Sequence, residues 1–161
     1  MFKYKSEEIF INNVEKCLKQ NGCNTWREVK PDNSRHRVDL IFYRKDFGFI
    51  GAEGKNINTL GCGGVISDAV KQIEKYKKQT YFNGKTIDKW CLLVPTETTR
   101  RCIIEMNRVL VFVRHFLKKQ YNILLLEYQP YKKVERIVID YGCKNSIYMG
   151  KGYCRIGEKN E

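Results

Sequence analysis

Two carboxylates and one amine stand close together in the sequence: Asp39, Glu53 and Lys55. The residues around them are typical of two β-strands joined by a turn near 45–48, with Asp39 entering the first strand and the other two ending the second. Because side chains alternate between faces along a strand, Glu53 and Lys55 project to one side and Gly54 to the other. Burying such charges is costly unless they pair or bind a cation. Their convergence therefore indicates a functional site.

The elements that must position this hairpin are predicted from hydrophobic periodicity. A glycine-rich stretch, 56–64, follows the hairpin, and Ser67 or Asp68 is predicted to cap the next helix. The predicted order of helix, strand, strand, strand, helix, strand, helix, strand and extra strands favours an α/β fold, with a mixed β-sheet flanked by helices. Besides the hairpin, the segments are a helix over 6–22, a strand over 25–30, a helix from 67 or 68 past 76, a strand over 89–94, a helix over 98–120, a strand over 123–128, and a terminal β-hairpin over 134–141 and 146–155.

Length and composition are those of one globular domain. At 161 residues, with 42% hydrophobic and 30% charged residues, the chain is expected to fold as a single domain over 1–161. Its core is expected over about 6–128 and a C-terminal β extension over about 131–156. The longest apolar runs, such as 123–126, are far too short to cross a bilayer, so we expect no membrane partner.

The chain is strongly basic, with 30 Lys and Arg against 18 Asp and Glu and a formal net charge of +12. A polyanion is the natural partner of such a protein, and DNA is the leading choice because phosphate contacts release counterions. The alternative is that the excess lysines only solvate the surface.

Seven cysteines occur without any Cys-x-x-Cys pair. Zinc and iron–sulfur sites usually contain such pairs, so a thiolate metal site is not expected. The odd count, and a start without the pattern of a secretory signal, predict an intracellular, cytoplasmic protein with reduced thiols.

The same residues resemble the PD-(D/E)XK nuclease superfamily, which includes restriction endonucleases, Holliday junction resolvases and RecB-type nuclease domains. The matching pieces are Asp39 at the head of a strand, Glu53–Lys55 at the end of the next, and a following helix that carries Gln72 and Tyr76. The order of elements agrees over 6–128. The resemblance implies a restriction-endonuclease-like fold and a metal-dependent endonuclease that hydrolyses phosphodiester bonds in DNA.

The resemblance also implies roles for the site. Asp39 and Glu53, with the backbone carbonyl of Gly54, would hold Mg²⁺ or Mn²⁺, and Lys55 would orient or activate the attacking water. These roles suit the residue types, because Mg²⁺ prefers carboxylate, carbonyl and water oxygens and lowers the pKa of a bound water. A nearby ammonium stabilises charge that develops on phosphoryl oxygens.

Other family positions match less well. Many members carry a glutamate in the first helix where this chain has Ile11, and Glu7, one turn earlier, can substitute for it. Gln72 and Tyr76 resemble a Gln-x-x-x-Tyr element that arranges the site and the nucleic acid strand. The residues expected to contact nucleic acid are Arg35, His36, Arg37, Lys71, Lys75 and Tyr76.

Plainer readings stay open at this point. Asp39, Glu53 and Lys55 can form an ordinary exposed salt bridge, Tyr76 can fill the core, and Gln72 can lie on the surface. The chain can also be a catalytically inactive nucleic-acid-binding protein on the same fold, or a nuclease subunit of a larger recombination or mobile-element complex. An enzyme that cuts two strands needs two sites, which favours a homodimer, whereas a strand-specific nuclease can act as a monomer.

Overall fold

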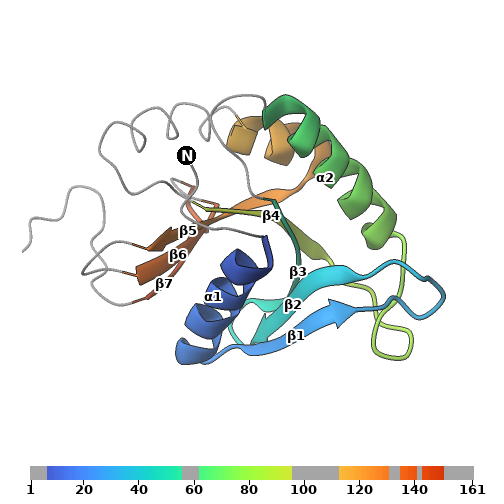
Figure 1. Cartoon of the computed structure of the whole chain (residues 1–161), viewed down its shortest axis with the longest axis horizontal. Helices are drawn as coiled ribbons and strands as arrows, with labels where there is room; N and C mark the ends of the chain where they lie inside the picture. The colour runs from blue at the N-terminus through green and yellow to red at the C-terminus, as the bar shows by residue number, and fades with distance from the viewer. Residues whose placement is uncertain (1–6, 56–61, 96–112, 131–134, 141–142, 151–161) are drawn as a thin grey trace, which may run out of the picture.

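The computed structural model describes residues 7–55, 62–95, 113–130, 135–140 and 143–150 (Figure 1). This part of the chain is a mixed α/β structure with a curled seven-stranded sheet and three helices. The helices are α1 (Glu7–Gln20), α2 (Cys62–Lys77) and a helix over 113–121, and the strands are β1 (Asn24–Val29), β2 (Val38–Arg44), β3 (Gly48–Gly54), β4 (Lys89–Pro95), β5 (Leu124–Pro130), β6 (Glu135–Ile139) and β7 (Ile147–Gly150).

The strands lie in the sheet in the order of the sequence. β1, β2 and β3 are antiparallel, β3, β4 and β5 are parallel, and β5, β6 and β7 are antiparallel again. Because β3 to β5 run the same way, their carboxyl ends meet at one edge of the sheet. The candidate residues at the end of β3 therefore lie at the edge where open α/β sheets usually bind ligands.

The core lies on both faces of the sheet. α1 covers one face with buried residues such as Phe10 and Leu18, and α2 and the helix over 113–121 cover the other, where Ile73 is fully buried (Figure 1). The strands β3 and β4 leave little room near Gly51, where a Cβ atom would lie 2.4 Å from the ring of Trp90. A glycine at this position therefore lets the largest core side chain lie against β3.

The predicted order of elements is confirmed wherever the structure describes the chain. The terminal strands continue the main sheet as β6 and β7, while 151–155 and most of the predicted helix over 98–120 lie outside the described residues. Within the described ranges, no helix has the length and apolar character that crossing a membrane requires.

The predicted start of the second helix at Ser67 or Asp68 is wrong, because α2 begins at Cys62. Val65 and Ile66 pack against the core on the α2 side of the sheet. This burial extends the helix through Gly64, whose low helix propensity alone would favour a loop.

Candidate active site

Asp39 and Glu53 are neighbours across the β2–β3 pair. The register Leu40↔Ala52, continued by one residue, places their side chains on the same face of the sheet, the face that α2 covers. Asp39 also accepts a hydrogen bond on Oδ2 from the backbone N–H of Gly54, at 2.8 Å. The carboxylate thus satisfies a donor at the end of the strand ladder, which fixes its position beside Glu53.

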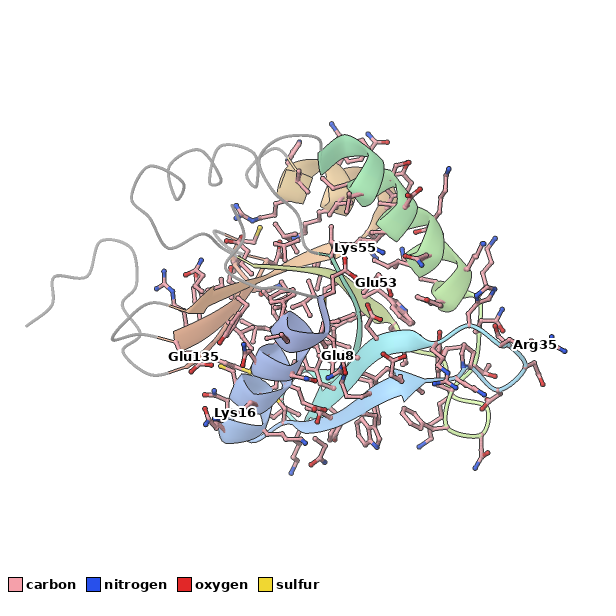
Figure 2. All side chains as sticks on the ribbon, in the orientation of Figure 1. Glu8, Lys16, Arg35, Glu53, Lys55 and Glu135 are labelled. Carbon is pink, nitrogen blue, oxygen red and sulfur yellow. The ribbon has the colours of Figure 1, made fainter. Side chains whose placement is uncertain are left out.

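Glu53 is buried, with 4% of its surface exposed, and its two oxygens have different surroundings. Oε1 lies 3.5 Å from Nζ of Lys55, whereas Oε2 is buried with no hydrogen-bond partner among the described residues. Lys55 is itself held in place by its backbone N–H, which donates to the carbonyl of Leu93 at 3.0 Å. Figure 2 shows Glu53 and Lys55 side by side between α1 and α2. A buried carboxylate oxygen without a partner is costly, so this position favours a proton or a cation.

The electrostatics of the pair agree with this geometry. Burial, and then the charge of Asp39, raise the pKa of Glu53 from its usual value of 4.5 to about 8, although the Lys55 ammonium opposes the shift. Burial also raises the pKa of Asp39, against the hydrogen bond from Gly54. Two carboxylates this close share protons, and a cation that binds both would displace them.

The donor set suits a hard divalent cation. Asp39 and Glu53 offer carboxylate oxygens, one of them buried without a partner, and no sulfur or imidazole ligand lies with them among the described residues. Mg²⁺ and Mn²⁺ bind through such oxygens and keep several water ligands, so two carboxylates are a sufficient protein contribution. Within the described ranges no group of three His, Cys, Asp or Glu side chains is arranged to hold a metal directly.

Tyr76 and Gln72 lie one turn apart on the same face of α2. Tyr76 is 5% exposed; its ring stacks on Trp90 with 5.7 Å between centroids, and its hydroxyl donates to the carbonyl of Arg37 at 3.0 Å. Burial, and then the charges of Glu53 and Asp39, raise the pKa of Tyr76, which places its hydroxyl near the carboxylates. Gln72 is half-buried, and its Oε1 is buried without a hydrogen-bond partner in the described part of the chain. The pKa shift of Tyr76 thus connects it to the carboxylates, and Gln72 carries a second buried oxygen without a partner among the described residues on the same face of α2.

The first helix brings an apolar residue to the site. At Gly54 a Cβ atom would lie 2.8 Å from Cδ1 of Ile11, so Ile11 packs directly against the end of β3. This is the position at which the family pattern has a glutamate. Glu7, the predicted substitute, is exposed in the first turn of α1.

The basic residues predicted to contact nucleic acid lie on the surface around the site. Arg35, His36 and Arg37 belong to the loop between β1 and β2, and Lys71 and Lys75 are exposed on α2. Figure 2 places Arg35 at the tip of its loop, well apart from Lys55. A ligand that contacts both would have to extend along the surface beyond the carboxylates.

Glu28 on β1 is close to the site, although nothing in its sequence neighbourhood indicates a role. Its charge raises the pKa of both Asp39 and Tyr76. The register between β1 and β2 brings it there, and that register spans a loop of irregular structure over 30–37.

Comparisons with known proteins add little to this geometry. No protein-family model matches the chain, and no curated protein does. Among solved structures, the chain is similar to one described as a crystal structure of a repair endonuclease from Pyrococcus abyssi, with 14% sequence identity and a TM-score of 0.38. The match covers 81% of this chain and 50% of that one, so the chain spans about half the length of this neighbour. A likeness at this level does not assign a function, which has to follow from the site itself.

Proposed function

We propose that the protein is a metal-dependent endonuclease with a restriction-endonuclease-like fold that hydrolyses phosphodiester bonds in DNA. One observation carries the proposal: a buried glutamate, Glu53, keeps one oxygen without a hydrogen-bond partner in the described part of the chain while it lies beside Asp39 and 3.5 Å from the amine of Lys55. An ordinary exposed salt bridge does not explain this arrangement, because Glu53 is buried and its pKa is raised toward neutrality. A site for a hard cation does explain it.

Each residue of the site would have a separate role. Asp39 and Glu53, with the carbonyl of Gly54, would hold Mg²⁺ or Mn²⁺. When bound, such an ion neutralises phosphate charge and lowers the pKa of a coordinated water. Lys55 would orient the attacking water and stabilise the charge that develops on the phosphoryl oxygens. Its contact with Glu53 holds the ammonium at the cation site, where the water and the phosphate would meet.

DNA is the substrate that the charge of the chain favours. The formal net charge is +12, and exposed basic residues lie on α2 and on the loop between β1 and β2. Phosphate contacts by such residues give salt-dependent binding that tolerates any sequence. The buried carboxylates would then select the bond to be cut by position, since only a phosphate at the edge of the sheet can approach Lys55.

The proposal is tested by incubating linear duplex, single-stranded, flap and four-way junction DNA with the full chain and Mg²⁺ or Mn²⁺. Lys55→Ala and Asp39→Asn are each expected to lower the cleavage rate by about 100-fold or more, because each removes charge stabilisation at the reacting phosphate. Lys19→Ala is the matched control, since Lys19 is an exposed lysine that pairs with Glu15 within α1.

Two results would count against the proposal. Cleavage that persists in Lys55→Ala or Asp39→Asn would show that the site is elsewhere. Tight, salt-dependent DNA binding without cleavage under either metal would instead favour a catalytically inactive binding protein.

A further inference from the structure

Four aromatic side chains gather on the face of the sheet that α2 partly covers. Trp26 lies on β1, Tyr43 on β2, Phe49 on β3 and Phe82 in the loop after α2. The ring centroids of Tyr43 and Phe49 are 4.7 Å apart and those of Trp26 and Phe82 5.2 Å, and Phe49 is 5.8 Å from both Trp26 and Phe82. These four residues are called the aromatic cluster below.

The aromatic cluster remains partly exposed to solvent. Each of its four side chains is half-buried, whereas aromatic residues that fill the core, such as Tyr81 and Trp90, are buried. Its inner side packs against the core on the α2 side of the sheet. α2 ends at Lys77, before the loop that carries Phe82, so the helix does not extend over the cluster. Contiguous exposed apolar surface of this kind often marks an interaction site.

The backbone holds Phe82 in the cluster in a strained conformation. The φ angles of Phe82, Asn83 and Gly84 are 52°, 63° and 100°, in the left-handed region that is unfavourable for a bulky residue. Asp32 fixes this loop, because it accepts hydrogen bonds from Oγ1 of Thr80 at 2.8 Å and from the N–H of Gly84 at 2.9 Å. Figure 1 shows the loop next to the one between β1 and β2. Strain that the surroundings impose in this way is often found at functional sites.

Positive charge borders the aromatic cluster. Exposed lysines lie just after β1, in the turn between β2 and β3, and in the loop of Phe82: Lys30, Lys45 and Lys85. Of the acids in these stretches, Asp32 and Asp46 already have partners, and Glu28 is exposed. Aromatic rings bordered by ammonium groups suit a nucleic acid strand with unpaired bases, since the bases stack on the rings and the lysines contact the phosphates.

The aromatic cluster and the carboxylates lie on the same face of the sheet. Tyr43 and Asp39 are four residues apart on β2, so strand alternation places both side chains on the α2 side, about 13 Å apart along the strand. Lys30 and the exposed Arg35 and Arg37 belong to the segment that connects β1 to β2. A DNA strand that reaches the carboxylates therefore needs only a few nucleotides to reach the cluster.

We propose that the aromatic cluster binds unpaired bases of a single-stranded DNA segment. This inference rests on the proposed function, because it names the substrate class of that site: DNA with an unpaired stretch next to the bond that is cut. A continuous duplex keeps its bases stacked inside the helix and offers none to the rings. Binding through the bases requires no metal, so it is measured separately from cleavage.

The test measures binding of the full chain to labelled oligo(dT) of about 12 nucleotides by fluorescence anisotropy without metal. The matched ligand is an oligonucleotide of the same length with the same phosphates and no bases. The wild type is expected to bind oligo(dT) about tenfold more tightly than the ligand without bases. Oligo(dT) should also quench the emission of Trp26, because Trp90 is only 1% exposed. Equal dissociation constants for the two ligands would overturn the inference, and this comparison needs no variant.

Phe82→Gly removes one ring of the cluster. Glycine adopts a φ angle near 52° without strain, so the loop is expected to keep its fold. The dissociation constant for oligo(dT) should rise about tenfold, while that for the ligand without bases should not change. Phe82→Tyr keeps a ring and should bind as the wild type does. Phe116→Ala, which removes a 40% exposed ring on the helix over 113–121, is the control and should also bind as the wild type does. Unchanged oligo(dT) binding by folded Phe82→Gly would overturn the inference.

The outcomes distinguish this inference from the proposed function. If cleavage depends on Asp39 and Lys55 while oligo(dT) and the ligand without bases bind equally, this inference is overturned and the proposed function stands. If oligo(dT) binds through its bases and no DNA is cleaved with either metal, the proposed function fails and the aromatic cluster remains a binding surface for single-stranded DNA.

Discussion

Glu53 on β3 and Glu127 on β5 are both buried near the same edge of the sheet, yet their surroundings differ. Glu127 is 1% exposed, and both of its oxygens accept hydrogen bonds: Oε1 from Arg114, and Oε2 from Nε2 of Gln129 at 3.3 Å. Arg136 in turn donates to Oε1 of Gln129. Glu53 lies beside a second acid and keeps Oε2 without a partner in the described part of the chain.

The two glutamates differ in how far the fold itself satisfies their charge. A buried charge whose oxygens all accept hydrogen bonds holds its neighbours in place, and removing it takes a charged partner away from them. A buried charge that is left incomplete destabilises the fold unless a proton or a cation binds there. Burial and residue type are alike at the two positions, so the partners alone distinguish them.

The largest effect on stability is expected at Glu127. Glu127→Ala would leave the mostly buried guanidinium of Arg114 without its carboxylate, at a cost of about 3 to 5 kcal/mol in the free energy of unfolding. Urea unfolding followed by circular dichroism measures this change. A loss of less than about 1 kcal/mol, the range of exposed ion pairs, would remove the contrast between the two glutamates.

The opposite sign is expected for Glu53→Gln without metal. This change removes a buried charge that lacks a full set of partners, so it should raise the free energy of unfolding by about 1 to 2 kcal/mol at pH 9. Mg²⁺ is expected to raise the melting temperature of the wild type and to leave that of this variant unchanged. A loss of stability at pH 9 would show that Glu53 is structural like Glu127.

The pH dependence of stability should also differ. The pKa of Glu53 is raised in the folded state from 4.5 to about 8, so between these values the folded state binds more protons than the unfolded state. The contribution of Glu53 to the stability of the metal-free wild type should therefore be greatest below pH 4.5 and should be lost as the pH rises to about 8. Urea unfolding at several pH values tests this, and Glu53→Gln should flatten that part of the curve.

A smaller effect is expected at Tyr76, which connects α2 to the region around Asp39 and Glu53. Tyr76→Phe removes the hydrogen bond to the carbonyl of Arg37 and should lower the free energy of unfolding by about 1 kcal/mol. Tyr43→Phe, at a half-buried tyrosine on β2, is the control. It should change the stability by less than about 0.5 kcal/mol. Equal effects of the two changes would argue against a specific role for the Tyr76 hydroxyl.

The sequence by itself determined the local part of this protein. The hairpin that brings Asp39 beside Glu53 and Lys55 was predictable because strand alternation and a short turn fix which side chains share a face. The α1 helix and the buried strand β4 followed from hydrophobic periodicity in the same way. These features depend on residues that are near each other in the chain.

The tertiary structure decided what depends on distant residues. The sequence predicted a strand near β1, but only its register with β2 places Glu28 opposite Asp39. Likewise, the start of α2 at Cys62 depends on packing against the core, which outweighs the preference of glycine for loops. The hydrogen bonds that complete Glu127 and leave Glu53 incomplete depend on which helices and strands pack together, and a sequence pattern does not carry that information.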